Sequence, residues 1–150
     1  MASSGADRVS RLVLDTSAYS HFRRGHSEVL DALARAEQVL IPVTVLGELE
    51  AAFESGARAR ENRRALEDFL AEPFVDAVDA TPSVARHYGR AFAALKRAGT
   101  PLPVNDIWIA AATLDCGGTL LTFDRDVARV AGLDHITLTA SGSVAPGVTS

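Results

Sequence analysis

Residues 105–126 read NDIWIAAATLDCGGTLLTFDRD, and this stretch decides the fold class. Asn105 is suited to cap a helix over 106–115 that is apolar on nearly every side, which is typical of a buried helix. The Gly-Gly pair predicts a turn, and an apolar strand over 119–123 then ends at Asp124. A buried helix that turns directly into a buried strand favours an α/β protein with a parallel sheet.

The same alternation continues on both sides of this stretch. Apolar runs predict strands over 11–14, 39–43, 74–78 and 136–138. Helical spacing and capping residues predict helices over 16–36, 44–56, 60–70 and 82–98. Strands that alternate with helices predict an α/β fold whose sheet is mostly parallel and covered on both faces.

The chain of 150 residues has the length of one domain. We expect a loose leader over 1–10, one folded domain over 11–139 and a disordered tail over 140–150. The first twenty residues lack the apolar stretch of a signal peptide, and no segment reads as a membrane span. The expected location is therefore the cytoplasm. A single cysteine, Cys116, excludes an internal disulfide framework.

The formal net charge of −4 argues against a protein that binds nucleic acid by bulk charge alone. Every basic residue except Lys96 is arginine. Arginine is the better bidentate partner for phosphate and carboxylate, although codon bias explains the same preference. Any nucleic-acid contact must therefore come from local basic groups.

Four acidic residues are predicted to meet at one edge of the sheet. Asp15 and Asp124 follow the ends of two strands, Glu48 lies one turn into a helix, and Asp106 opens the buried helix. In open parallel sheets, ligands bind at the carboxyl ends of the strands. Each acid also has an ordinary explanation, because carboxylates at such junctions cap helices and favour the helix dipole.

A cluster of carboxylates needs a compensating charge. Two carboxylates about 4 Å apart repel by about 4 kcal/mol at an effective dielectric constant of 20. That cost is large beside a typical domain stability of about 5–15 kcal/mol. A divalent cation is the simplest compensation, and oxygen ligands favour Mg²⁺ or Mn²⁺. Such ions activate water and neutralise phosphate charge during in-line displacement.

Competing chemistries have weaker support. The chain has no glycine-rich phosphate loop, and its four histidines lack paired zinc spacing. The segment DRDV at 124–127 mimics the nucleophile motif of haloacid-dehalogenase-like phosphatases. That motif normally opens its domain, whereas only 24 residues follow Asp126 here.

Four motifs together resemble the PIN-domain ribonucleases, specifically the VapC-type toxins of bacterial toxin–antitoxin pairs. They occur in the family's order: LDTS at 14–17, VLGEL at 45–49, NDIWIAA at 105–111 and LTFDRD at 121–126. The resemblance implies a PIN-like three-layer α/β/α fold with a four- to five-stranded, mostly parallel sheet. It also implies an Mg²⁺-dependent endoribonuclease, with Mn²⁺ able to substitute, that uses water to cut RNA, transfer RNA being one possible target.

By position, the resemblance makes Asp15, Glu48, Asp106 and Asp124 the catalytic acidic quartet. Asp15 and Asp106 would be the principal metal ligands, and Glu48 would ligate the ion or orient its water. Asp124 would complete the metal site, and Asp126 could serve a second ion.

Supporting residues are also expected from the resemblance. Thr122 would form a hydrogen bond within the site. Val127 departs from the family pattern, since many relatives carry phenylalanine there, and we expect only a small packing change.

Contacts to RNA are expected from basic groups close to the first strand, namely Arg23, Arg24 and His26, with a solvated helix face as the alternative. Tyr19 and Phe22 are candidates for stacking on a base, although core packing is the better expectation for Phe22. A second basic cluster, for which we favour simple solvation, contains Arg58, Arg60, Arg63 and Arg64.

The expected partners are an RNA substrate, a cognate antitoxin that covers the acidic site, and a second copy of the chain in a homodimer. Two other functions stay open. One is a catalytically silent PIN-like module that binds RNA or protein, and the other is a structure-specific DNA nuclease. Metal-dependent cutting of RNA compared with DNA separates the three.

Overall fold

The computed structural model describes residues 8–141. Five strands form one sheet in the order β3-β2-β1-β4-β5, and every neighbouring pair is parallel. The strands are β1 (Val9–Leu14), β2 (Ala36–Pro42), β3 (Val75–Val78), β4 (Thr119–Thr122) and β5 (Asp134–Thr137). The α/β class and the parallel sheet predicted from the sequence are confirmed.

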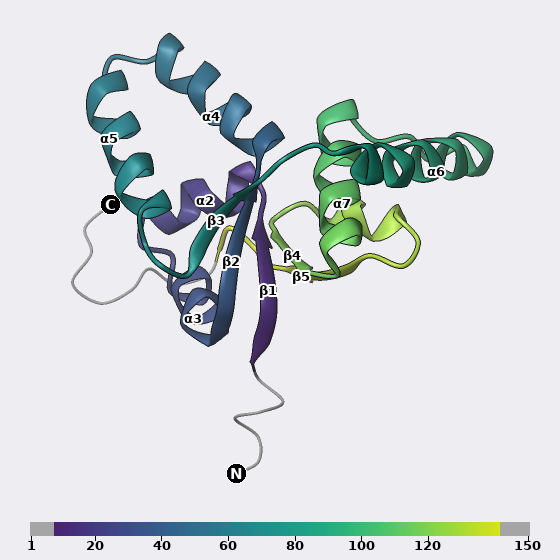
Figure 1. Ribbon diagram of the computed structural model, residues 1–150, viewed down its shortest axis with the longest axis horizontal. Helices are drawn as coiled ribbons and strands as arrows, with labels where there is room; N and C mark the ends of the chain where they lie inside the picture. Colours follow the sequence, from purple (N-terminus) through teal and green to yellow (C-terminus); the bar gives the residue numbers. More distant parts are fainter. Residues whose placement is uncertain (1–7, 142–150) are drawn as a thin grey trace.

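Helices cover both faces of the sheet. They are α2 (Thr16–Arg23), α3 (Ser27–Arg35), α4 (Val43–Ser55), α5 (Ala59–Leu70), α6 (Pro82–Ala98) and α7 (Val104–Cys116), with a 3-10 helix η1 (Arg125–Arg129). In Figure 1 the helices α2, α3 and α5 lie on one side of the strands, and α6 and α7 lie on the other. This arrangement confirms the three-layer architecture.

The order of the strands reverses beside β1. From β1 the chain builds outward through β2 to β3, and it then returns to add β4 and β5 on the other side. The carboxyl ends of β1 and β4 therefore flank a topological switch point, where connections leave in opposite directions. In open α/β sheets this crevice is the usual place for a ligand.

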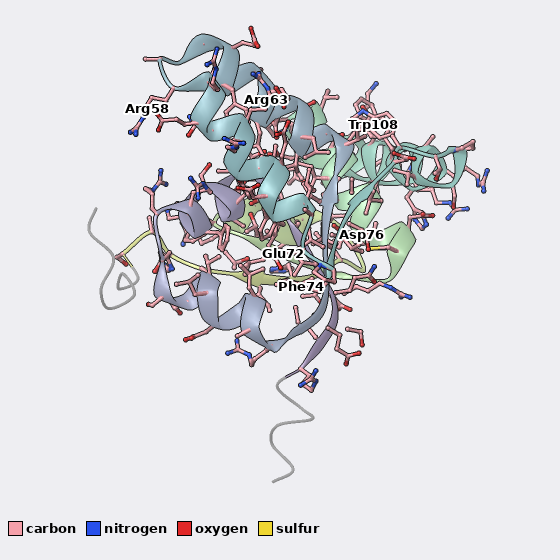
Figure 2. All side chains as sticks on the ribbon, turned by 60° about the vertical axis from the view of Figure 1, so that its left-hand side comes forward. Arg58, Arg63, Glu72, Phe74, Asp76 and Trp108 are labelled. Carbon is pink, nitrogen blue, oxygen red and sulfur yellow. The ribbon has the colours of Figure 1, made fainter. Side chains whose placement is uncertain are left out.

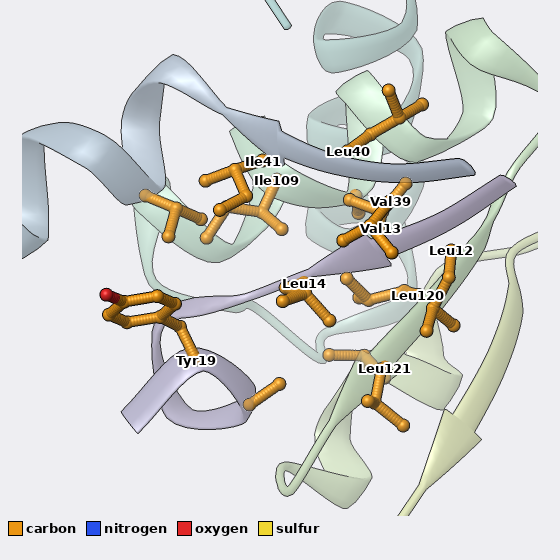
Figure 3. Close-up of a cluster of buried hydrophobic side chains, with 14 of the residues drawn as sticks. Leu12, Val13, Leu14, Tyr19, Val39, Leu40, Ile41, Ile109, Leu120 and Leu121 are labelled. Atoms are coloured by element: carbon orange, nitrogen blue, oxygen red, sulfur yellow. The ribbon is translucent and has the colours of Figure 1, made fainter. Parts of the chain in front are cut away.

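The central strands are apolar because both of their faces are buried. Figure 3 shows the packed side chains, of which Leu12, Leu14, Leu120 and Leu121 are at most 1% exposed. Parallel strands covered on both faces need such continuous apolar runs, since no residue faces water. The register pairs Leu14 with Leu121, so β1 and β4 end side by side.

Two element boundaries differ from the sequence prediction near the start of the chain. β1 begins at Val9, so residues 9 and 10 belong to the sheet and not to the leader expected over 1–10. The single helix expected over 16–36 is two helices, because Gly25 adopts a φ of 77° between them. That left-handed conformation ends α2 and costs little only for glycine.

Two helix starts were also misassigned. α4 begins at Val43 with Pro42 in the capping position, and not with Thr44 as the cap. α7 begins at Val104, so Asn105 lies inside the first turn and its side chain is not a cap. The helix α6 was predicted correctly, with Thr81 as its cap and Gly99 ending it at a φ of 70°.

Residues 1–7 and 142–150 lie outside the described part of the chain, so the predicted leader and tail largely stay predictions. Within residues 8–141, no helix combines the length and the apolar character needed to cross a bilayer.

Candidate functional site

The acids predicted to cluster lie around the carboxyl ends of β1 and β4. Asp15 directly follows β1, and its backbone N–H donates to the Leu121 carbonyl of β4 at 3.4 Å. Asp124 lies two residues beyond the end of β4. The two strands thus bring together two carboxylates that are more than one hundred residues apart in the sequence.

Three hydrogen bonds hold the carboxylate of Asp15 at this edge. Its Oδ1 accepts from the Ala18 N–H and from the Ser17 hydroxyl, both at 2.8 Å, so it caps α2. Its Oδ2 accepts from the hydroxyl of Thr122. Thr122 is fully buried, and its oxygen also accepts from the Asp124 N–H at 3.0 Å. Thr122 therefore links the acids of β1 and β4, as the sequence analysis expected.

Glu48 is fixed between two other elements. The Thr16 hydroxyl at the start of α2 donates to Glu48 Oε1, and the Asn105 amide in the first turn of α7 donates to Oε2 at 3.2 Å. The side chain that the sequence assigned to a helix cap thus orients a carboxylate. Thr16, Ser17 and Asn105 are site residues that sequence reasoning treated only as capping groups.

Asp106 shows that the acids share one neighbourhood. Burial and then the charges of nearby carboxylates raise its pKa from 3.8 to about 6. The strongest of these charges come from Asp124, Glu48, Asp15 and Asp126. The other four predicted acids therefore all act electrostatically on Asp106, and its pKa is the one that rises most.

Burial also raises the pKa of Asp15, against the lowering effect of its hydrogen bonds from Thr122, Ala18 and Ser17. Asp124 adds to the increase by repulsion. Between residues 8 and 141, no basic side chain forms an ion pair with any member of the quartet. The site thus carries negative charge without a local protein counter-charge.

The two acids after β4 have different surroundings. Asp124 caps η1, because its Oδ1 accepts from the Asp126 N–H at 2.9 Å. Asp126 is exposed and lies 3.3 Å from the Arg129 guanidinium. Asp126 is therefore the more peripheral acid and the one with a partner of its own.

The donor set matches a hard cation in its chemistry, since it offers carboxylate oxygens and hydroxyls. In the conformation described for residues 8–141, no three histidine, cysteine or acidic side chains are arranged around a common ion position. The oxygens of Asp15 and Glu48 face hydroxyl and amide donors instead. An ionised carboxylate has about four acceptor sites, so Asp15 and Glu48 keep lone pairs for a cation while these hydrogen bonds hold them.

Of the residues expected to contact RNA, Arg23 and Arg24 are exposed, whereas His26 is only 4% exposed. His26 Nε2 lies 3.2 Å from the Thr139 carbonyl, and no hydrogen-bond partner for its Nδ1 lies within residues 8–141. The burial of His26 leaves it no surface for RNA in this conformation.

The more accessible histidine is His21, which stacks on Phe123 with ring centres 3.8 Å apart. Its Nδ1 lies 2.9 Å from the Ser17 carbonyl. Because Ser17 and Phe123 both neighbour the acids, His21 belongs to the wall of the site.

The aromatic candidates are core residues. Tyr19 is 2% exposed and packs on Phe22 and Phe69, so it cannot stack on a base. Trp108 is half-buried and stacks on Tyr88 of α6 at 4.1 Å.

The arginines of the second basic cluster differ in their ion pairs. Arg63 pairs with Glu50 and Glu54 at 2.7 and 2.9 Å, whereas in the described part of the chain Arg58 pairs only with the exposed Glu61. Figure 2 shows Arg58 projecting from the end of the α4–α5 pair. Arg58 is thus the member of this cluster with the freer guanidinium.

Comparison with known proteins agrees with this description. The family model for the PIN domain matches residues 12–133. No curated protein matches the chain.

The fold is also found in solved structures. The chain is similar to VapBC2 from Rickettsia felis bound to a DNA fragment from their promoter, with a TM-score of 0.76 and 20% identity over 85% of this chain and 98% of that one. The chain is similar to DNA-bound VapBC from Salmonella typhimurium with a TM-score of 0.76 and 22% identity, again over 85% of this chain and 98% of that one. A third similar structure is VapBC-5 from Mycobacterium tuberculosis, a member of the VapBC family of toxin–antitoxin systems. Its TM-score is 0.69, and the identity is 26% over 86% of this chain and 99% of that one.

Proposed function

Since this chain belongs to the PIN domain family, we propose that it is a Mg²⁺-dependent endoribonuclease of the VapC toxin type. Its reaction is hydrolysis of an RNA phosphodiester by water, and transfer RNA is the first substrate to test. A ribonuclease that acts on cellular RNA belongs in the cytoplasm.

One observation carries the proposal. Burial, and then the repulsion of four neighbouring carboxylates around the ends of β1 and β4, raises the pKa of Asp106 to about 6. A protein that only needed helix caps gains nothing from placing these acids together, and their repulsion costs stability. A divalent cation converts this cost into a binding site.

Asp15, Glu48, Asp106 and Asp124 would hold the cation, with Asp126 at its periphery. When bound there, Mg²⁺ supplies positive charge against the scissile phosphate and makes water a better nucleophile. The protein's part is to hold the oxygens in place, and the bound cation would favour their ionised form against the burial and repulsion that raise the pKa of Asp106.

The second layer of residues does this holding. Thr122 directs Asp15, and Thr16 and Asn105 direct Glu48. Such partners orient ligands and tune their basicity, and their loss typically costs about 10- to 100-fold in metal affinity or activity.

A cognate antitoxin is the proposed protein partner. Support comes from the similarity to VapBC-5, a member of a toxin–antitoxin family. Further support comes from an open apolar hollow of about 510 Å³ between α2, α3 and α5, whose lining includes Phe22, Leu33, Phe69 and Phe74. Phe74 is 42% exposed, which is high for such a side chain.

A homodimer is also part of the proposal. Val43, Phe92 and Val104 are between 42% and 52% exposed. Two of them begin the helices α4 and α7 that carry Glu48 and Asp106. Burial of these side chains against a second copy would place two acidic sites in one assembly.

Incubation of the purified protein with total RNA tests the proposed activity. We expect cutting with Mg²⁺ or Mn²⁺ and none with EDTA. Asp15→Asn should abolish cutting, whereas Asp31→Asn, an equal change of charge on the exposed face of α3, should leave it intact.

Three outcomes would contradict the proposal. Cutting that persists in EDTA would show that the activity does not depend on a metal ion. Cutting by the Asp15→Asn variant would show that the acids around β1 and β4 are not the active site. Cutting of single-stranded DNA but not of RNA would favour the DNA nuclease instead.

A further inference from the structure

A basic hollow lies between α2, α4 and α5, at the end of α2 that is farther from Asp15. It has a volume of about 440 Å³. Its polar lining comes from Tyr19, Ser20, Arg23, Arg24, Arg58 and Asn62, and the rest of its lining is apolar. Three guanidinium groups and no carboxylate in one hollow are unexpected in a chain with a net charge of −4.

Most of this charge is unneutralised. Among residues 8–141, neither Arg23 nor Arg24 forms an ion pair, and Arg58 pairs only with Glu61 on the exposed surface. A surface ion pair of this kind is weak and is readily exchanged for a stronger partner. The hollow therefore has net positive charge and five N–H donors on each guanidinium.

Tyr19, which is one of the residues that line the hollow, carries a buried polar atom for which the described residues provide no partner. Tyr19 is 2% exposed, and its hydroxyl oxygen is buried with no hydrogen-bond partner in the described structure. Figure 3 shows this hydroxyl turned away from the leucine and valine side chains of the strands. Buried hydroxyls nearly always have a partner, so this one indicates a missing ligand or water.

The neighbouring charge acts on this hydroxyl. Burial raises the pKa of Tyr19, and the guanidinium of Arg23 partly offsets the increase. Tyr19 therefore stays a neutral O–H donor at physiological pH, beside cationic donors. Neutral and cationic donors that converge without an acceptor form a site for an anion.

α2 and α4 connect the hollow to the acidic edge. α2 begins directly after Asp15 and carries Arg23 at its other end, about 12 Å away at 1.5 Å per residue. α4 carries Glu48 and also contributes Leu49, Ala52 and Phe53 to the hollow. Arg58 lies directly before α5, at the end of the α4–α5 pair (Figure 2). A single-stranded RNA of a few nucleotides is long enough to reach from Asp15 to the hollow.

We infer that this α2–α4–α5 hollow, lined by Tyr19 with its buried hydroxyl and by Arg23, Arg24 and Arg58, is a phosphate-binding subsite that holds the RNA backbone beside the acidic edge. The inference rests on the proposed ribonuclease function for the identity of its ligand. It explains how an acidic protein binds a polyanion: phosphate is held at the hollow, while the acidic edge is left to the cation.

The test uses a labelled single-stranded RNA and fluorescence anisotropy in EDTA, where binding is measured apart from hydrolysis. Arg24→Ala and Arg58→Ala should each weaken binding by about threefold or more at low salt. Each should also reduce the slope of log affinity against log salt by about 0.7, the value for one lost phosphate contact on a single strand. Arg35→Ala is the matched control, because Arg35 is exposed at the end of α3, directly before the start of β2, and does not line the hollow.

Tyr19→Phe separates a ligand contact from a structural role. This variant keeps the ring that packs on Phe22 and Phe69 and removes only the hydroxyl. We expect thermal stability to be equal or higher, since an unpartnered buried group is gone, while RNA affinity falls several-fold. Unchanged RNA affinity in this variant would remove the hydroxyl from the site.

Parallel cutting assays distinguish the two claims. If the wild type cuts RNA while Arg24→Ala and Arg58→Ala bind and cut like Arg35→Ala, the subsite is wrong and the ribonuclease stands. If the arginine variants lose RNA binding but no protein cuts RNA with Mn²⁺, the subsite stands and the ribonuclease is wrong. A wild type that binds poly-glutamate through these arginines but not RNA would overturn the subsite.

Discussion

Asp106 concentrates the electrostatic cost of the site in one side chain. Its carboxyl group is partly buried and lies within the influence of four other acids. Asp15 avoids part of the same cost because three donors satisfy its oxygens. The acids are therefore unequal: Asp15 is held in place by hydrogen bonds, whereas the burial and repulsion at Asp106 are a cost that the proposed cation would offset.

Asp106→Asn should stabilise the metal-free protein. The folded-state pKa of about 6 lies above the unfolded value of 3.8, so the folded protein binds the extra proton between these values. Stability therefore falls as the pH rises from about 4 to about 6 and stays lower above it. With a discount for partial exposure, the variant should gain about 1 kcal/mol at pH 7, or about 3 °C in Tm.

The measurement is thermal unfolding in EDTA at pH 5 and pH 7. The gain should be larger at pH 7, because wild-type Asp106 is protonated for most of the time at pH 5. Asp31→Asn removes a charge elsewhere and should give no such pH dependence. Equal shifts in the two variants would show that net charge, and not the cluster, sets the stability.

Thr122→Val should impair catalysis through Asp15. Valine has nearly the same shape as threonine but cannot donate to Asp15 or accept from the Asp124 N–H. We expect kcat to fall by about 10- to 100-fold with little change in KM, since the substrate does not contact this buried residue. Thr122→Ser should restore most of kcat, and failure of that rescue would mean that packing is the cause.

At the scale of elements, helix breaks decide where the site residues point. α2 is only eight residues long, and the left-handed Gly25 separates it from α3. The break lets α2 run beside the carboxyl edge while α3 returns to start β2 at the other end of the sheet (Figure 1). Without this break, the basic end of α2 would not lie beside α4 and α5.

Two glycine substitutions test this reading with opposite signs. Gly25→Ala should destabilise the protein by about 1–3 kcal/mol, because alanine resists a φ of 77°. Gly89→Ala should stabilise it by up to about 1 kcal/mol, because Gly89 lies inside the helix α6 with open space around its Cβ position. Urea unfolding measures both, and a stabilising Gly25→Ala would refute the role of the break.

Periodicity and turn residues predicted most of these elements correctly. The five strands and the helices α5, α6 and α7 follow from apolar spacing, and Thr81 and Gly99 mark the ends of α6. The break at Gly25 was missed because one glycine inside a helical pattern is compatible with a continuous helix.

The site was predictable only in part. The acids were found because strand ends meet at one edge of a parallel sheet. The hydrogen bonds of Thr16 and Asn105 to Glu48 were missed, because a capping residue and an orienting residue look alike in sequence. The burial of Tyr19 and His26 depends on packing by helices distant in the chain, which local spacing does not report.

At the scale of the whole molecule, the net charge of −4 hides two regions of opposite sign. The carboxyl edge of β1 and β4 gathers acids, and the α2–α4–α5 hollow gathers arginines. A cation at the first region and a phosphate at the second would neutralise both. Under the proposed function, the charge distribution and not the net charge would fit this chain to a polyanion.

Mg²⁺ should therefore stabilise the whole fold. A ligand that binds only the folded state raises stability by an amount that grows with its concentration over its Kd. We expect the Tm of the wild type to rise on titration with Mg²⁺ or Mn²⁺, and Asp126→Asn to retain most of that rise because Asp126 is exposed and paired with Arg129. If Asp126→Asn lost the whole rise in Tm, the ion would have to bind at Asp126 and not between Asp15 and Asp106.

The central claim is that the acids around β1 and β4 hold a divalent cation, and binding of Mn²⁺ followed by electron paramagnetic resonance tests it most directly. Wild type and Asp31→Asn should remove free Mn²⁺ from solution with the same affinity, whereas Asp15→Asn and Asp106→Asn should bind it at least about tenfold more weakly. Mn²⁺ affinity that is the same in the wild type and in both site variants would contradict the account.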